Sequence, residues 1–205
     1  FSQHSRRGLI MTAYSHYQGG NYDEAITSAN RYVNLYPTSP EAPYAMYIGA
    51  MSFYNQVPDI SRDQERAEKA LQLFNALIEK YPKSEYVEDS RYKVQVMRDQ
   101  LAGKEMSVGR FYLGRRMYPA AVNRFRDVIA KYQTTRHVEE ALFRLTEAYM
   151  GLGISHEAQT AAAILGHNYP ESQWYKDAYA LLANGGLQPS QSPGSWLTKI
   201  FRRTG

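Results

Sequence analysis

A Tyr-Pro pair punctuates this chain at a fixed distance after small and apolar residues. It occurs at Tyr36-Pro37, Tyr81-Pro82 and Tyr169-Pro170, and Tyr132-Gln133 is a degenerate copy. Counted back from the second residue of each pair, position 12 is always alanine, and positions 8 and 5 are alanine or a larger apolar residue. Fixed offsets inside blocks of roughly 34 to 50 residues are typical of stacked helical hairpins. The pattern therefore predicts an all-α solenoid, a fold that presents an extended surface to other polypeptides.

The residues at these offsets have the sizes that helix packing requires. Helices that approach closely need small side chains at the contact and larger ones in the neighbouring layers. Position 24 is also small in three blocks, and Gly49 takes that role in the second, nine residues further back. The predicted packing residues are Ala25, Ala29 and Tyr32; Ala70, Phe74 and Leu77; Ala121, Phe125 and Val128; Ala158, Ala162 and Leu165; and, at position 24, Ala13, Gly109 and Thr146.

Turn residues divide the chain into about ten helices, or four to five repeats, of which the second and third are irregular. The second repeat is stretched by a loop over residues 55–62, and its next helix is expected from about Ser61 to Tyr81. Extra sequence between Tyr86 and Leu101 predicts one additional or unusually long helix. We expect two N-terminal repeats over residues 1–83, C-terminal repeats with the extra helix over 84–183, and a linker with a short amphipathic tail over 184–205.

The positive charge of the chain is concentrated in one segment. The formal net charge is +4, yet residues 104–136 alone contain eight Arg or Lys and two Asp or Glu, a net charge of +6. A nucleic-acid binder could show such a patch, and so could a docking face for an acidic protein. No aromatic-rich nucleic-acid module accompanies the arginines, which favours a protein partner and predicts no nucleic-acid binding.

The sequence contains no pattern typical of catalysis. The five histidines lack metal-ligand spacing such as His-Glu-x-x-His, and no Gly-x-Ser-x-Gly elbow or phosphate-binding loop occurs. Cysteine is absent, which excludes disulfides, thiolate zinc sites and cysteine nucleophiles. No stretch approaches the roughly 20 apolar residues of a transmembrane helix. We therefore expect a protein that is not an enzyme and that has no metal and no cofactor.

Two groups of aromatic and apolar residues are candidates for binding. Most of the 18 tyrosines should be structural, because the ring packs while the hydroxyl reaches solvent. A minority on the inner face, namely Tyr14, Tyr17, Tyr47 or Tyr54, could stack on a bound peptide. In the tail, i,i+4 spacing and nearby cations predict either an amphipathic anchor for a membrane or partner, or a segment folded back on the last helix pair. The tail residues are Trp196, Leu197, Ile200 and Phe201.

The blocks resemble the tetratricopeptide repeat, and features beyond the repeat resemble the BamD family. The fourth block places Leu142, Tyr149, Gly153, Ala158 and Pro170 on signature positions of the repeat. The resemblance to BamD, a lipoprotein family of the outer-membrane β-barrel assembly (BAM) machinery, covers residues from about 14 to 183. Its more specific parts are Tyr22-Asp-Glu-Ala25, the stretched second repeat, Arg98-Asp-Gln-Leu-Ala102, Val108-Gly-Arg-Phe-Tyr112 and Ala121-Val-Asn-Arg124.

This resemblance implies a function and a docking residue. The C-terminal repeats would bind the last periplasmic POTRA domain of BamA, and the N-terminal repeats would receive unfolded outer-membrane proteins. The arginine of the Val-Asn-Arg segment belongs to the BamA contact in the family, which here is Arg124. It lies inside the +6 segment, so we expect a partner-binding set of Arg124, Asn123, Arg115, Arg116 and Arg126.

The same resemblance implies a location and leaves two rivals. We expect the periplasmic face of the outer membrane of a Gram-negative bacterium, contacts with other assembly lipoproteins, and a lipid anchor on a cysteine upstream of Phe1. One rival is another periplasmic repeat protein, such as the Tol–Pal coordinator, which also has Tyr-Pro-x-Ser repeats but would lack the stretched repeat and the Val-Asn-Arg segment. The other is a basic nucleic-acid-binding solenoid, which predicts steeply salt-dependent binding.

Overall fold

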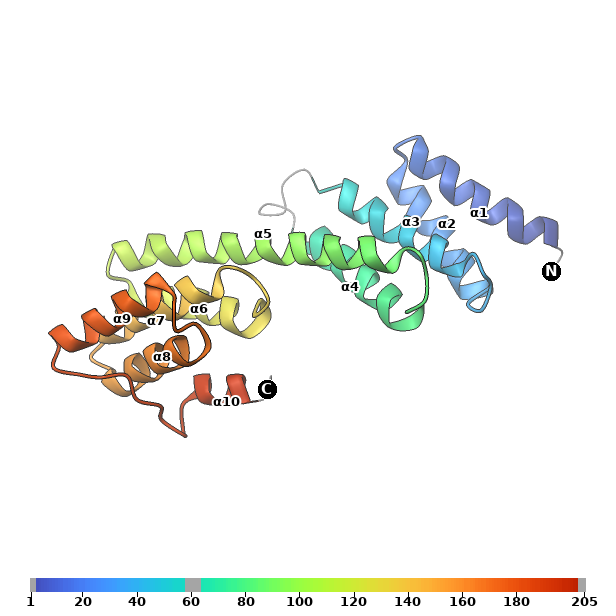
Figure 1. Cartoon of the computed structure of the whole chain (residues 1–205). Helices are drawn as coiled ribbons and strands as arrows, with labels where there is room; N and C mark the ends of the chain where they lie inside the picture. The colour runs from blue at the N-terminus through green and yellow to red at the C-terminus, as the bar shows by residue number, and fades with distance from the viewer. Residues whose placement is uncertain (1–2, 58–63, 203–205) are drawn as a thin grey trace. The chain divides into compact units, whose positions relative to one another are not determined.

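The structure is a computed structural model that describes residues 3–57 and 64–202, without the side chains of residues 3, 4 and 64. These residues form ten α-helices and no strand, which confirms the predicted all-α solenoid (Figure 1). The second repeat's loop falls partly on residues 58–63, outside the described residues. The helices are α1 Gln3–Gln18, α2 Tyr22–Leu35, α3 Ala42–Asn55, α4 Gln64–Lys80, α5 Val87–Gly114, α6 Tyr118–Lys131, α7 Val138–Gly151, α8 Ser155–Asn168, α9 Gln173–Asn184 and α10 Trp196–Arg202.

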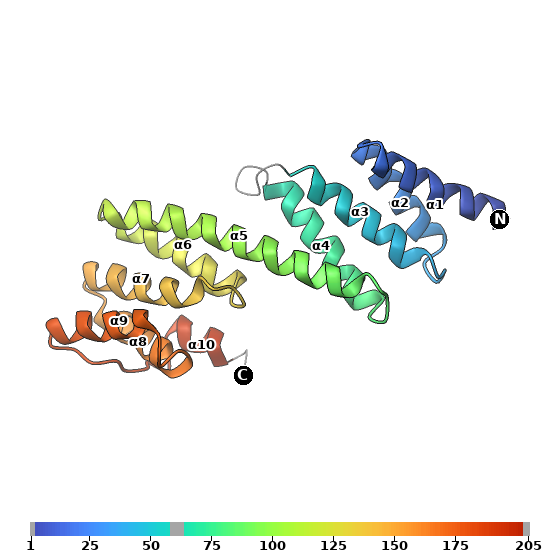
Figure 2. The same cartoon turned by 45° about the horizontal axis from the view of Figure 1, so that its top comes forward.

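The helices pack as two units, residues 1–100 and residues 101–205. In the first, α1 packs on α2, α2 on α3 and α3 on α4; in the second, α6 packs on α7 and α7 on α8 and α9, as Figure 2 also shows within each unit. Helix α5 has 28 residues and contributes to both units, which confirms the unusually long helix expected after Tyr86. The predicted boundary between the N-terminal and C-terminal repeats at residue 83 was placed at a repeat-ending turn, not at a boundary in packing, and it stays a prediction.

The repeat offsets mark the core. The twelve residues at positions 12, 8 and 5 are all 0% exposed. The small residues of position 24, Ala13, Gly109 and Thr146, are buried as well, and so is Gly49. At Gly109 the α5 backbone lies so close to the ring of Phe125 on α6 that an added Cβ would fall 2.4 Å from Cε1. Small residues are therefore required where helices approach each other, as the spacing predicted.

The four repeat-ending turns share one backbone geometry. In each, the N–H of the third residue after the tyrosine donates to the carbonyl of the tyrosine: Ser39 to Tyr36, Ser84 to Tyr81, Thr135 to Tyr132, and Ser172 to Tyr169. The copy with glutamine in place of proline closes in the same way as the others. This bond uses only backbone atoms of residues that flank the proline position, so the turn forms without proline.

The segment between α9 and α10, which was predicted to be a linker, is hydrogen-bonded to α8. The backbone N–H of Ser190 donates to the carbonyl of Gln159 at 3.3 Å, and the N–H of Ser192 donates to Thr160 Oγ1 at 3.1 Å. The side chain of Gln159 donates in turn to the Gln188 carbonyl at 2.8 Å. Thr160 is 0% exposed, so the segment covers this part of α8 and supplies partners for its polar atoms.

Candidate protein-interaction surfaces

Arg124 lies in the middle of α6 and forms an ion pair with a buried carboxylate on α5. Its Nη1 donates to Glu105 Oε2 at 3.1 Å, and the two side chains are 42% and 10% exposed, respectively. The hydrogen bond to Glu105 raises the pKa of Arg124 above its usual value. A guanidinium has five N–H donors, so one bond to Glu105 leaves capacity for a carboxylate of a partner.

Asn123 and Arg126 lie on the same outward part of α6, on the side next to α10. Asn123 and Arg126 are exposed, and the Arg126 guanidinium lies over the indole of Trp196, 4.6 Å from the ring centroid. A cavity of about 410 Å³ opens between the two helices, lined by Asn123, Arg126, Asp127, Ala130, Trp196 and Ile200. Of the five predicted residues, the structure thus brings Asn123 and Arg126 together at this cavity, whereas Arg124 points to the other flank of α6, toward Glu105 of α5.

Arg115 and Arg116 do not join this surface, because they lie in the turn between α5 and α6. The guanidinium of Arg115 lies over the exposed ring of Phe111 at 3.9 Å. Arg116 has a φ of 59°, in the left-handed region, at the turn position that is glycine in two other repeats, Gly20 and Gly153. This conformation crowds the Cβ of any residue other than glycine, so Arg116 stores backbone strain.

We expect Arg116→Gly to raise the free energy of unfolding by about 0.5–1 kcal/mol, because relief of the left-handed strain outweighs the entropy that glycine adds to the unfolded chain. Arg115→Gly in the same turn is the control and should lower stability by about 0.5–1 kcal/mol, since it adds flexibility without relieving strain. Urea unfolding of the two variants measures both. Equal destabilisation by the two changes would show that the φ of Arg116 carries no strain.

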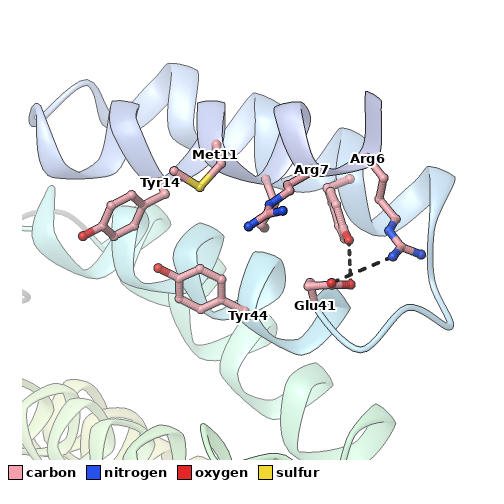
Figure 3. A pocket seen from close by; sticks show the side chains of 8 residues that line it. Arg6, Arg7, Met11, Tyr14, Glu41 and Tyr44 are labelled. Atoms are coloured by element: carbon pink, nitrogen blue, oxygen red, sulfur yellow. Dashed lines mark hydrogen bonds and ion pairs between the residues drawn. The ribbon is translucent and has the colours of Figure 1, made fainter. Parts of the chain in front are cut away.

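In the first unit, the predicted Tyr14 borders a pocket of about 460 Å³ (Figure 3). Tyr14 is 38% exposed, and its ring centroid lies 6.4 Å from that of Tyr44 on α3. At the other end, Tyr32 donates a hydrogen bond to Glu41 Oε2 at 3.2 Å, and Arg6 lies 4.0 Å from the same carboxylate. The pocket thus combines an aromatic and apolar wall with charged groups at its rim.

Most of the lining of this pocket was not predicted from the sequence, namely Arg6, Arg7, Ile10, Met11, Tyr32, Glu41 and Tyr44. A signal was present for part of it. Residues 7, 10, 11 and 14 follow the i, i+3, i+4, i+7 spacing of one helix face, and Met11 on that face is 55% exposed. On this face Met11 and Tyr14 are the exposed apolar and aromatic side chains, and such side chains next to each other indicate a surface that another chain can cover.

The other predicted tyrosines have partners within the unit. Tyr47 donates to Asp89 Oδ2 at 2.6 Å and stacks on Tyr86, with ring centroids 4.9 Å apart. Burial, followed by the hydrogen bond to Asp89, raises the pKa of Tyr47. The ring of Tyr54 packs edge-on against Phe74. These contacts continue to Tyr14 through Tyr44 and Tyr86 and give this unit a connected row of aromatic rings.

Tyr17 has a separate set of contacts. Its hydroxyl accepts a hydrogen bond from Asn55 Nδ2 at 3.1 Å, and its ring lies 6.0 Å from that of Tyr22. Tyr14 is therefore the predicted tyrosine that lines the pocket, and Tyr17, Tyr47 and Tyr54 support the helices around it. Their role in peptide binding stays a prediction.

The tail folds back on its own unit, where α10 contacts α8, and its role as an anchor for a membrane or partner stays a prediction. Leu197 is 0% exposed, and the Nε1–H of Trp196 donates to the hydroxyl of Tyr149 on α7 at 2.9 Å. Ile200 and Phe201 pack against the same core. Ser195 fixes the start of α10, because its Oγ donates to Glu157 at 2.6 Å and accepts from the N–H of Leu197.

Over the described part of the chain, no group of three or more His, Cys, Asp or Glu side chains is placed to hold a metal ion. Nor does any helix in the described ranges have the length and apolar character to cross a membrane. The fold and the two surfaces define a class: a tetratricopeptide-type helical-repeat protein with a basic surface on α6 and an aromatic pocket between α1 and α3.

Comparison with known proteins gives the family. The YfiO family, described as an outer membrane lipoprotein, matches residues 1–165. The chain is 47% identical over 193 residues to outer membrane protein assembly factor BamD of Caulobacter vibrioides, covering 94% of this chain and 63% of that protein. It is 44% identical over 175 residues to BamD of Rickettsia prowazekii, covering 85% and 70%. BamD of Neisseria meningitidis serogroup A is 33% identical over 188 residues, covering 87% and 70%.

The chain belongs to the YfiO family of outer membrane lipoproteins and to the BamD family, and this confirms the family that the sequence motifs indicated. It spans 63% of the length of the Caulobacter relative. Residues 166–205 lie beyond the segment that the family matches. They include the last turn of α8 and all of α9 and α10.

Proposed function

We propose that this chain is a non-enzymatic scaffold subunit of the machinery that assembles β-barrel proteins in the outer membrane. It acts at the periplasmic face of that membrane, binds the last POTRA domain of BamA, and contacts other assembly lipoproteins. Three relatives with the name outer membrane protein assembly factor BamD support this role, as does the family description of an outer membrane lipoprotein.

The observation that carries the proposal is the state of Arg124. Its guanidinium pairs with Glu105 of α5 at 3.1 Å, and the Arg124 side chain remains 42% exposed. A fixed and accessible guanidinium loses less conformational freedom when it binds a carboxylate than a freely rotating one does. Asn123, which precedes Arg124 in α6, is exposed as well and adds a polar side chain. This arrangement supports docking of an acidic surface of a partner protein.

The aromatic pocket of the first unit supports the second half of the role, the reception of unfolded barrel precursors. Unfolded outer-membrane segments carry exposed apolar and aromatic side chains, and rings of tyrosine offer large contact areas at low cost in conformational entropy. Tyr14, Tyr44 and Met11 provide such a wall, and Arg6 and Arg7 lie at the pocket. We therefore assign precursor binding to this pocket and insertase binding to α6.

The proposal is tested by Arg124→Glu in the full chain, with affinity for the purified periplasmic POTRA domains of BamA as the measurement. We expect a loss of about ten-fold or more, because the change replaces an attractive charge with one that repels an acidic partner. Arg31→Glu, a charge reversal at an exposed position of α2, is the matched control and should bind like the wild type. Equal capture of the wild-type and Arg124→Glu chains would exclude Arg124 from the interface, and no capture of the wild-type chain would exclude this partner.

A further inference from the structure

The groove between α6 and α10 has no role in the proposed function. We propose that this groove binds an acidic segment of the partner protein, with Arg126 as its charged contact and Trp196 as the residue that positions Arg126. The proposal rests on the proposed function, because its partner is the protein proposed to bind Arg124, which lies on the other flank of α6. The groove is lined by Asn123, Arg126, Asp127 and Ala130 from α6, and by Trp196 and Ile200 from α10.

The charges around the groove favour an acidic occupant. Arg126 is exposed at its edge, and Lys199 and Arg202 are exposed on α10. The acidic residue of the lining, Asp127, is neutralised within the same helix by Lys131, whose Nζ lies 3.1 Å from Oδ1. The surface that remains is cationic, and complementary charge raises both the association rate and the selectivity for a partner.

Arg126 is held in place before any partner arrives. Its guanidinium lies 4.6 Å from the centroid of the Trp196 ring, a distance within the range of cation–π attraction. Trp196 is itself fixed by the hydrogen bond from its Nε1 to the hydroxyl of Tyr149 at 2.9 Å. An arginine stacked on a fixed indole loses little further freedom on binding, and Trp and Arg are the residues that most often dominate binding energy at interfaces.

The shape and chemistry of the groove suit a polypeptide. The cavity of about 410 Å³ has room for one or two side chains, with Ile200 and the small side chain of Ala130 as its apolar surface. Asn123 is exposed at the lining and can both donate to and accept from a peptide backbone. We therefore infer an occupant in which an Asp or Glu stands next to an apolar residue.

A membrane surface is a poorer fit than a protein. Insertion into a bilayer would require apolar side chains that point outward from α10. Instead, Leu197 is 0% exposed, and Trp196, Ile200 and Phe201 pack on the core of the unit. Most of the apolar surface of the tail is therefore packed against the protein, and the exposed side of α10 has the cations Lys199 and Arg202.

The test measures the affinity of full-chain variants for the purified POTRA domains. Arg126→Ala should weaken binding roughly three- to ten-fold, as expected for an interface arginine of moderate weight. Lys176→Ala, which removes an exposed cation from α9 in the same unit, is the control and should change nothing. Trp196→Phe keeps a ring under Arg126 and should bind within about two-fold of the wild type, whereas Trp196→Ala should lose as much as Arg126→Ala. Because Trp196 acts through Arg126, the double alanine variant should lose no more than Arg126→Ala alone.

The outcomes separate this inference from the function on which it rests. If the wild type binds and Arg124→Glu does not, but Arg126→Ala binds like Lys176→Ala, then the groove is outside the interface and only this inference is overturned. If the wild type does not bind, both fall. Thermal melts of each variant show whether α10 stays seated, and a Trp196→Ala chain that melts like the wild type yet keeps full affinity also overturns the inference. Sedimentation with phosphatidylglycerol vesicles gives the remaining arm: vesicle binding lost in Arg126→Ala, with POTRA affinity intact, would assign the groove to the membrane instead.

Discussion

Replacing Phe125 with alanine is expected to lower the free energy of unfolding of the second unit by about 3–5 kcal/mol, the usual cost of removing a buried phenylalanine side chain. Phe125 is 0% exposed and lies in the core cluster that joins α5 to α9, in contact with Gly109. Tightly packed helices on both sides cannot close the cavity that the change leaves, so the lost contacts are not recovered.

Urea unfolding followed by tryptophan fluorescence measures this effect directly. The chain has two tryptophans, Trp174 and Trp196, and both belong to the second unit. Phe111→Ala provides the control, because that ring is on α5 in the same unit but is 51% exposed. It should cost less than about 1 kcal/mol. A cost of similar size for both variants would mean that the repeat offsets do not mark the core.

Gly109→Ala should destabilise the same unit by about 1–3 kcal/mol, although alanine is the better helix former. A Cβ at this position would lie 2.4 Å from Cε1 and 2.8 Å from Cζ of Phe125. The ring is fully buried, so it can move away only by displacing its neighbours. Gly114→Ala on the same helix is the matched control. An added Cβ meets nothing within 4 Å there, so stability should stay the same or rise slightly.

A double-mutant cycle identifies the ring as the cause. In a Phe125→Leu background, the two closest clashing atoms, Cε1 and Cζ, are absent, and Gly109→Ala should then cost less than half of its value in the wild type. If Gly109→Ala destabilised the unit equally in the two backgrounds, the strain would lie somewhere other than between α5 and α6. The same fluorescence measurement serves all four proteins.

The repeat core could be predicted from sequence because its cause is local and periodic. Close helix contacts recur at the same distance before each turn, so Ala121 and Ala158 mark equivalent contacts without any knowledge of the rest of the chain. The length of α5 was also predictable, since no strong breaker interrupts the sequence between Tyr86 and the turn at Arg115. Gly103 lies inside that helix and does not end it.

The tail and the charges could not be predicted in the same way, because their outcome depends on distant residues. Residues 184–194 have the composition of a linker, yet Gln159 and Thr160 of α8, about 30 positions away, hold this segment in place. Part of the +6 segment is likewise neutralised from outside, since Arg110 pairs with Glu140 at 2.9 Å. Charge counted along the sequence therefore overstates the basic surface that a partner meets.

The candidate site was predictable only in part for the same reason. The Val-Asn-Arg segment pointed to Arg124, but nothing in it shows that Glu105 is the partner of that residue. Similarly, the hydroxyl of Tyr47 is occupied by Asp89, which lies 42 positions later in the chain. The sequence places Tyr14 and Tyr17 on one helix and Tyr47 and Tyr54 on another, and only the packed helices show which hydroxyls already have partners.

The turn that ends each repeat has a consequence for how such chains can vary. The bond from the Thr135 N–H to the Tyr132 carbonyl forms with glutamine at the intervening position, as the equivalent bonds form with proline. Each turn requires a fixed number of residues between the tyrosine carbonyl and that N–H. Substitution between those two points leaves the bond available, whereas insertion or deletion removes it. The lengths of these turns are therefore under tighter constraint than their residues.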